Sequence, residues 1–317
     1  MIAYLDFEKP VADLEGKVAE LRALQEGEGG VRVADEITRL EAKAGQALRD
    51  IYAKLTPWQK TQVARHPGRP HALDYIDALI AEFTPLAGDR KHGEDEAIIG
   101  GLGRFQGRPV LVMGHEKGSD TESRLKHNFG MARPEGYRKT VRLMELADRF
   151  GLPVIAFVDT AGAYPGIGAE ERGQAEAIAR GIDACLSLGS PNVAVVIGEG
   201  GSGGAVAIAV TNKVLMLEHA IYTVASPEAS ASILWHDSAR ATDAATAMKI
   251  TAADLKKFGV IDDIIPEPTG GAQRDPKTAI ESTGRAIEAA LQEFDGLDAD
   301  EIRRSRREKF IAMGRTL

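Results

Sequence analysis

The sequence predicts an α/β architecture, in which helices cover both faces of a central sheet. From about residue 96 onward, short apolar segments alternate with longer segments of helical periodicity. The two clearest strands, LPVIAFV at 152–158 and VAVVI at 193–197, are continuously apolar. Strands that are buried on both faces have this composition, so the sheet is expected to lie between two helical layers.

The first 55 residues have the periodicity of two amphipathic helices. Apolar residues recur at spacings of three and four from Leu14 to Leu24 and again from Ile37 to Leu55, with a break at the glycines of 27–30. We expect a helical hairpin that packs on the main domain or on a neighbouring subunit. The helical pattern stops in residues 56–70, where three prolines and a glycine predict a connecting loop.

The remaining elements follow from the same patterns. Strands are predicted at 97–101, 109–114, 152–158, 193–197 and 214–217, and helices at 134–150, 169–188 and from 205 onward. Two further helices are predicted at 276–294 and 300–313, after a loop rich in proline and glycine.

The composition excludes several classes of protein. The chain has 317 residues and a formal net charge of −8, which argues against a nucleic-acid binder that works through bulk positive charge. Cys185 is the one cysteine, so an internal disulfide or a cysteine-based zinc site cannot form. The opening MIAYLDFEKP lacks the basic and apolar stretches of a signal peptide, and no apolar run reaches the roughly 20 residues that cross a bilayer. We therefore expect a cytoplasmic enzyme or enzyme subunit that binds no metal, membrane or nucleic acid.

The segment GEGGSGG at 198–204 lies between a buried strand and a helix of small residues, and three chemistries share that context. The first is dinucleotide binding, because Gly198, Gly200 and Gly203 match G-x-G-x-x-G and Glu218 follows where a ribose-binding acid could lie. That fingerprint normally opens its domain, whereas here two strand–helix units precede it.

The second chemistry is a nucleophile elbow. Gly200, Ser202 and Gly204 match G-x-S-x-G, with His219 and His236 downstream. The order of acid and histidine that such a triad requires is not met, because Glu218 and His219 are adjacent and point to opposite faces of a strand.

The third chemistry is a backbone oxyanion hole. Consecutive glycines at a helix N-terminus leave peptide N–H groups free without a Cβ to keep a ligand away, and the helix dipole adds partial positive charge. The segment DTAGAYPGIG at 159–168 leaves the preceding strand in the same way. Two such turns would place two sets of backbone donors on one side of the sheet. A purely structural role, close packing of helix on sheet, also stays open for the glycines.

Five segments, in order along the chain, are similar to the alpha subunits of bacterial acetyl-CoA carboxylase carboxyltransferases. They are NFGMARPEGYRK, AFVDTAGAYPGIGAEERGQ, VIGEGGSGGA, SPEASASILW and IDDIIPEPTGGAQRDP. The resemblance covers nearly the whole chain and implies a crotonase-like (ClpP/crotonase) fold of repeated ββα units, with an N-terminal helical extension and C-terminal helices. It suggests a helical extension at 1–38, a carboxyltransferase domain at 39–293 and a C-terminal helix at 294–317.

The resemblance also implies a function that needs partners. In that family the alpha subunit pairs with a beta subunit in an α2β2 heterotetramer, and the active site lies between the two chains. Biotin arrives as carboxybiotin on the biotin carboxyl carrier protein, a separate biotin carboxylase uses ATP, and zinc is bound by the beta subunit alone. The complex would transfer CO2 from carboxybiotin to acetyl-CoA and give malonyl-CoA for fatty acid biosynthesis, while the alpha chain itself binds no cofactor.

Carried over to this sequence, the resemblance assigns roles to the glycine turns. The peptide N–H groups of Gly203 and Gly204 would form the oxyanion hole that stabilises the ureido oxygen of biotin. The expected substrate-binding residues are Gly200, Gly201, Gly162, Ala163 and Tyr164. The sequence departs from the family at Ala161, where proline is common, and at Ser119, where a basic residue is expected, so a phosphate contact by residues 118–129 is doubtful.

Other functions stay open at this point. One is a subunit of another biotin-dependent acyl-CoA carboxylase or decarboxylase that acts on a longer acyl group. Another is an NAD-dependent oxidoreductase that uses the turn from Gly198 to Gly203, and a third is a scaffold without catalytic activity. Among the remaining residues, Cys185 is expected to be buried and inert, and the arginines of residues 303–307 are expected to favour the dipole of the last helix.

Overall fold

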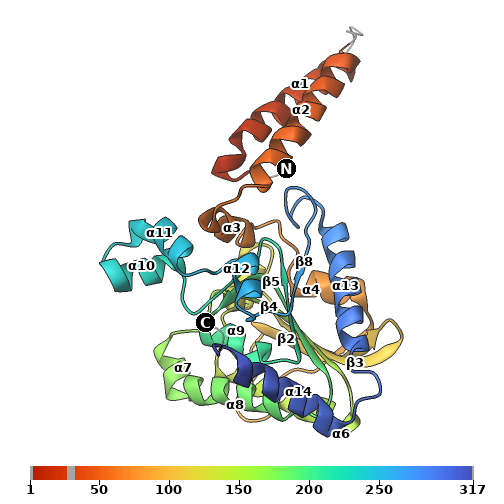
Figure 1. Ribbon diagram of the computed structural model, residues 1–317, viewed down its shortest axis with the longest axis vertical. Coiled ribbons are helices and arrows are strands. Elements are labelled where there is room, and N and C mark those ends of the chain that lie inside the picture. Colours follow the sequence, from red (N-terminus) through yellow and green to blue (C-terminus); the bar gives the residue numbers. More distant parts are fainter. Residues whose placement is uncertain (1–2, 27–32, 316–317) are drawn as a thin grey trace.

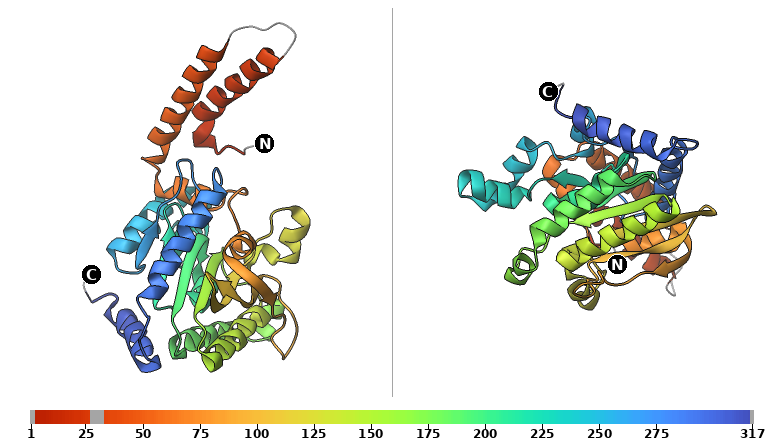
Figure 2. Two further views of the ribbon diagram at one scale, coloured as in Figure 1. Left: turned by 90° about the vertical axis from the view of Figure 1, so that its right-hand side faces the viewer. Right: turned by 90° about the horizontal axis from the view of Figure 1, so that it is seen from below.

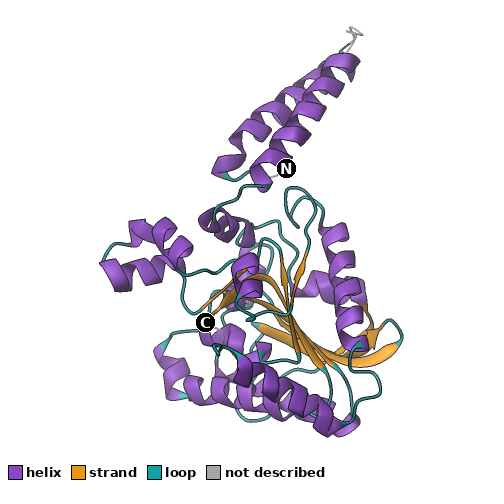
Figure 3. Ribbon diagram, viewed as in Figure 1, coloured by secondary structure: helices purple, strands orange, loops and turns teal. Residues whose placement is uncertain are grey.

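A central sheet with helices on both faces forms the body of the molecule (Figures 1 and 3). The computed structural model describes residues 3–26 and 33–315. Within this part of the chain the sheet has eight strands, in the order β1-β2-β3-β4-β5-β6-β8, and β7 pairs with β5 outside that row. The strands are β1 (Ile80–Pro85), β2 (Ile98–Phe105), β3 (Arg108–His115), β4 (Val154–Thr160), β5 (Asn192–Gly201), β6 (Lys213–Leu217), β7 (Ile221–Thr223) and β8 (Asp263–Ile265). The α/β prediction is therefore confirmed.

The sheet is antiparallel at one end and parallel in the rest. Strands β1, β2 and β3 pair antiparallel, whereas β3, β4, β5, β6 and β8 pair parallel. All residues of β4 and β5 are buried, as their apolar runs predict.

Strand β5 changes its neighbour along its length. Residues 193–196 pair with β6, and residues 199–201 pair with β7. We call this change of partner the fork of β5. Between the two pairings the carbonyl oxygen of Ile197 accepts a hydrogen bond of 2.8 Å from Nη2 of Arg69, a buried side chain that pairs with the buried Glu267.

Two layers of helices cover the sheet. Helices α6 and α9 contact the strands on one face, with α8 packed against both, and α4 and α13 contact the strands on the other face. The helices of these layers are α4 (Ala72–Leu79), α6 (Pro134–Phe150), α8 (Gln174–Ser187), α9 (Ser202–Ala209), α13 (Pro276–Gln292) and, packed on α8, α14 (Ala299–Ala312). Further helices are α3 (Pro57–Ala64), α5 (Thr121–Lys126), α7 (Ile167–Glu171), α10 (Pro227–Trp235), α11 (Ala241–Ala247) and α12 (Ala252–Lys257).

The predicted N-terminal hairpin is present as α1 (Lys9–Glu26) and α2 (Ala34–Tyr52), which pack against each other and project from the body (Figures 1 and 2). At its base, Tyr52 Oη donates to Glu8 Oε1 at 3.1 Å and accepts from Gln273 Nε2 at 3.0 Å. The predicted break at 27–30 lies outside the described residues. Helix α2 runs across the boundary expected between residues 38 and 39, and the division of the chain into domains stays a prediction.

The prediction of a loop for residues 56–70 is wrong in its first half. Thr56 caps helix α3: its Oγ1 accepts from Gln59 N–H at 3.2 Å, while Gln59 Oε1 accepts from Thr56 N–H at 2.9 Å. This is a capping box, and Pro57 occupies the first helical position, where proline is favoured. The proline therefore begins a helix here.

The helix expected at 169–188 is two helices, α7 and α8. Gly173 lies between them with φ of 82°, a left-handed conformation that ends one helix and begins the next at a new angle. Apolar residues occur on both sides of the break, so the periodicity alone did not reveal it. None of the helices in the described ranges is both long enough and apolar enough to cross a membrane.

Candidate active site

The site is built on the turn that joins β5 to α9. Ser202, the first residue of α9, has φ of 51°, and the next residues begin the helix directly. The backbone N–H groups of Gly203 and Gly204 lie in the first turn of α9, where the helix itself offers them no acceptor. Gly203 lines the cavity described below, whereas Gly204 is buried against the turn after β4. The first turn of α9 therefore offers donors that suit an anionic oxygen.

Two of the glycines in this turn allow it to touch the turn that follows β4. A Cβ on Gly201 would lie 2.2 Å from the carbonyl oxygen of Ala161, and a Cβ on Gly204 would lie 2.8 Å from the carbonyl carbon of Gly162. Such distances are impossible for a real side chain, so only glycine permits the contact. The expectation that the two glycine-rich turns lie on the same side of the sheet is confirmed.

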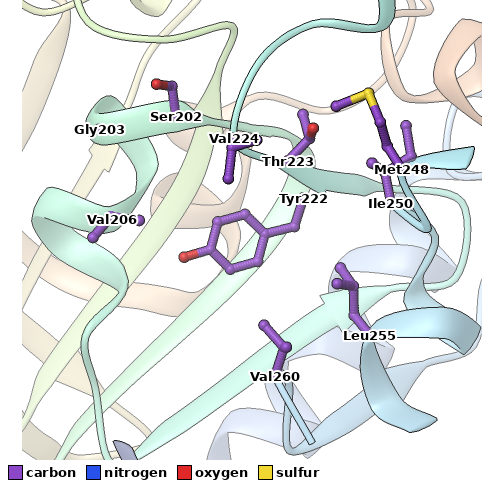
Figure 4. A pocket seen from close by; sticks show the side chains of 10 residues that line it. All are labelled: Ser202, Gly203, Val206, Tyr222, Thr223, Val224, Met248, Ile250, Leu255 and Val260. Atoms are coloured by element: carbon purple, nitrogen blue, oxygen red, sulfur yellow. The ribbon is translucent and has the colours of Figure 1, made fainter. Parts of the chain in front are cut away.

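A cavity of about 660 Å³ opens beside the turn (Figure 4). Its wall on α9 is formed by Ser202, Gly203 and Val206, and the ring of Tyr222 extends from β7 toward that helix. The remaining lining residues are Thr223, Val224, Met248, Ile250, Leu255 and Val260. The cavity is thus mainly apolar, with the first turn of α9 at one edge, which is the usual composition of a small-molecule site.

Most of the expected site residues come together around this turn. Gly200 lies in the fork of β5, beside Thr160 on one side and Tyr222 on the other. Gly162 and Ala163 pack directly on Gly204, with the nitrogen of Ala163 2.9 Å from the position of a Gly204 Cβ.

Tyr164 does not line the cavity. Its backbone N–H donates to Ala132 at 3.0 Å, and the guanidinium carbon of Arg133 lies 4.8 Å from the centre of its ring. The tyrosine therefore stands on the outer side of the turn after β4, beside the start of α6.

The residues of β7 and of the segment 248–260 that line the cavity were not predicted. Their only signal in the sequence is an apolar character that they share with the whole core. They become lining residues because β7 pairs with the last part of β5 and brings its side chains beside α9.

The geometry does not assemble the two alternative motifs. A Cβ on Gly198 would lie 2.5 Å from Oδ1 of Asp159, so this glycine leaves room for a buried carboxylate, whose negative charge disfavours a phosphate beside it. For the elbow, the ring of His219 packs against Tyr52, with ring centres 5.4 Å apart. In the part of the chain that the structure describes, the hydrogen bonds of histidine rings are made by His66, His71 and His127, and none of them involves Ser202.

A group of buried charges lies directly behind the turn. Lys117 Nζ is 2.8 Å from Asp159 Oδ1 and 2.8 Å from Glu199 Oε2. Burial alone would raise the pKa of Asp159, but Lys117 and a hydrogen bond with His71 hold that pKa well below its ordinary value. Burial alone would likewise raise the pKa of Glu199, and the charges of Lys117 and Arg65 lower it. Both carboxylates are therefore ionised at neutral pH.

His115 lies at the end of β3 beneath the same turn and is fully buried. Burial lowers the pKa of its imidazole to about 4, so the ring is neutral at physiological pH. Cys185 is buried, as expected, and burial raises the pKa of its thiol to about 12. Neither side chain lines the cavity. Across the described ranges, no group of three or more histidine, cysteine, aspartate or glutamate side chains could hold a metal ion.

Comparison with known proteins gives consistent matches. Residues 4–314 match the model of the family described as acetyl co-enzyme A carboxylase carboxyltransferase-like. The acetyl-coenzyme A carboxylase carboxyl transferase subunit alpha of Azorhizobium caulinodans is 69% identical over 317 residues, which is 100% of both chains. The protein of the same name from Rhodopseudomonas palustris is also 69% identical over 317 residues, covering 100% of this chain and 98% of its own.

Solved structures share the fold at low identity. The transcarboxylase 12S structure has a TM-score of 0.58 at 18% identity, over 71% of this chain and 42% of its own. A Pseudomonas malonate decarboxylase hetero-tetramer in complex with coenzyme A has a TM-score of 0.57 at 16% identity, over 68% of this chain and 86% of its own. The crotonase-like fold expected from the resemblance is confirmed.

Proposed function

The chain belongs to the family of acetyl-CoA carboxylase carboxyltransferase alpha subunits and is thus a biotin-dependent transferase, and we propose that its glycine turn binds the ureido oxygen of carboxybiotin. One observation carries this proposal. The N–H groups of Gly203 and Gly204 lie in the first turn of α9, where the helix itself offers them no acceptor. Ser202, Gly203 and Val206 of the same helix line an apolar cavity that can receive the rest of a small ligand.

Carboxybiotin is the substrate of the proposed reaction. It releases CO2 more readily when negative charge on its ureido oxygen is stabilised, and a single well-placed N–H donor lowers such a barrier by about 2.7–4 kcal/mol. The biotin anion then takes a proton from the methyl group of acetyl-CoA, and the resulting enolate attacks CO2 to give malonyl-CoA. The scheme needs positioning and charge stabilisation, and it needs no basic side chain from this chain. The cavity lining, which consists of apolar and hydroxyl side chains and glycine, agrees with that requirement.

The partners of the reaction are part of the proposal. We expect a carboxyltransferase beta subunit to complete the active site in an α2β2 assembly, to bind most of acetyl-CoA and to hold the zinc of the complex. The biotin carboxyl carrier protein would deliver carboxybiotin, and biotin carboxylase would form it with ATP. The malonyl-CoA would enter fatty acid biosynthesis in the cytoplasm.

The test is a substitution at the open position of the turn. A Cβ on Gly203 would meet only Ile178, with Cδ1 at 3.4 Å, so Gly203→Val should fold and assemble with the beta subunit. Its branched side chain would block access to the N–H groups. We expect carboxyl transfer from malonyl-CoA to free biotin, measured with the beta subunit present, to fall by about 10²–10³-fold.

Two controls accompany this measurement. Gly203→Ala reports on the stability of the turn, and size-exclusion chromatography reports on assembly. Near-normal turnover in an assembled Gly203→Val complex would contradict the proposed role of the turn. Turnover of acetyl-CoA and propionyl-CoA by the unmodified complex compares the proposed acceptor with a longer one.

A further inference from the structure

The buried charges behind the glycine turn connect both turns of the site through one lysine. The Nζ atom of Lys117 lies 2.8 Å from a carboxylate oxygen of Asp159 and 2.8 Å from one of Glu199. The three side chains are only 16%, 4% and 10% exposed. Burial alone would lower the pKa of Lys117, but the charges of Asp159 and Glu199 raise it, so the lysine is a cation.

Each carboxylate belongs to the strand that carries one of the turns. Asp159 lies in β4, immediately before Thr160 and the turn that contains Gly162. Glu199 lies in β5, immediately before Gly200 and the turn that leads into α9. The two strands are also joined directly, because Asp159 Oδ1 accepts a hydrogen bond of 2.9 Å from the backbone N–H of Glu199.

The same ion pairs continue outward to the far wall of the cavity. Glu199 Oε1 is 2.6 Å from Nε of Arg65, and Nη1 of Arg65 is 2.5 Å from Oε1 of Glu228. Glu228 lies in the first turn of α10, and Val224, which lines the cavity, comes shortly before this helix in the sequence. The chain of charges therefore joins β4, β5 and α10 to the segments that follow β3 and α3.

We propose that Lys117 is a positioning residue for carboxyl transfer, because by bridging Asp159 and Glu199 it holds the two glycine-rich turns at the spacing that aims the N–H groups of Gly203 and Gly204. This inference rests on the proposed function of those N–H groups. Lys117 itself does not line the cavity, so its effect passes through the ends of β4 and β5.

Loss of the lysine charge would leave two buried carboxylates facing the same space. Their repulsion would push apart the strand ends that bear the turns, and a displacement of about 1 Å in a catalytic group can cost about 10²-fold in rate. The pKa of one carboxylate would rise, so protonation below neutral pH would remove the repulsion and allow a hydrogen bond between the two. The other charged or titratable groups around this pair are Arg65, Arg69, His71, Tyr75, His115 and Glu228.

The experiment compares two lysines of equal burial in the complex with the beta subunit. Lys309 is also 16% exposed and pairs with one carboxylate, Asp262, but it lies in α14, away from the cavity. Transfer from malonyl-CoA to free biotin is measured for Lys117→Met, Lys117→Arg and Lys309→Met between pH 6 and 8.5. Thermal unfolding and assembly are measured for each variant.

We expect Lys117→Met to lower kcat at least tenfold at pH 8, with KM for malonyl-CoA within about twofold, and the deficit to shrink as the pH falls toward 6. Lys117→Arg should restore most of kcat, and Lys309→Met should lower Tm while kcat stays within about twofold. Equal kcat losses in the two methionine variants, or a deficit that does not change with pH, would overturn the positioning role. Normal turnover in Gly203→Val would instead show that the proposed function of the turn fails.

Discussion

The contact between the two glycine-rich turns makes Gly204→Ala a sharp test of the site. The added methyl group would lie 2.8 Å from the carbonyl carbon of Gly162, 2.9 Å from the nitrogen of Ala163 and 3.0 Å from Oη of Tyr137. Carbon atoms in contact are normally about 3.5–4.0 Å apart, so the turns must separate by about 1 Å. Two of the three neighbours are backbone atoms that cannot rotate away. Overpacking of this kind costs about 1–3 kcal/mol of stability, and a shift of about 1 Å in the donors costs about 10²-fold in rate.

The assay measures the free energy of unfolding in denaturant, together with kcat of the complex with the beta subunit. Gly100→Ala is the matched control, because its methyl group would lie 2.5 Å from Cδ1 of Leu143 and 3.1 Å from Cβ of Met113, in β2 and far along the sheet from the turns. Both variants should lose stability, but only Gly204→Ala should lose about 10²-fold in kcat per folded complex. Normal kcat in Gly204→Ala, or an equal loss in Gly100→Ala, would refute the claim that turn spacing controls catalysis.

Two further predictions concern stability. Arg306 is fully buried and donates to the carbonyls of Cys185, Leu188 and Ser190. Arg306→Met should therefore lower the free energy of unfolding in denaturant by about 3 kcal/mol or more, since each buried acceptor left without a donor costs about 1–3 kcal/mol. A loss below about 1 kcal/mol would contradict this. Burial alone would raise the pKa of Glu267, but the charge of Arg69 overrides burial and lowers that pKa to about 2 from 4.5. Its stabilising contribution should therefore be complete above pH 4.5 and be lost as the pH falls toward 2, and Glu267→Gln should flatten the acid side of the stability curve.

Elements with local signals at both ends could be predicted from the sequence. Helix α6 spans residues 134–150 as expected, because Pro134 occupies its first turn and Gly151, with φ of 63°, ends it. Helix α3 also has such signals in Thr56 and Gln59, but the prolines of residues 56–70 favour a loop as readily as a helix start. Strand β7 could not be predicted, because three residues become a strand only when a partner strand lies beside them.

The candidate site likewise has one part that could be predicted from the sequence and another that could not. A strand, a run of glycines and a small-residue helix are local features, so the turn and the helix N-terminus that follows it could be predicted from the sequence. The far walls of the cavity depend on which strands pair, and the residues from 248 to 260 reach the site only through tertiary structure. The arginines of the last helix illustrate the same limit, because the expected dipole interaction does not explain why Arg306, unlike its exposed neighbour Arg307, is fully buried.

The fork of β5 also bears on how this protein can diverge. The strand is continuous, yet its first half pairs with β6 in the main row of the sheet, whereas its last residues pair with β7, whose Tyr222 and Thr223 line the cavity. A substitution at Tyr222 or Thr223 would therefore alter the shape of the cavity, at the margin of the hydrophobic interior. A lineage can acquire a different selectivity through these positions while the folding of the domain, which depends on the other half of the strand, is inherited unchanged.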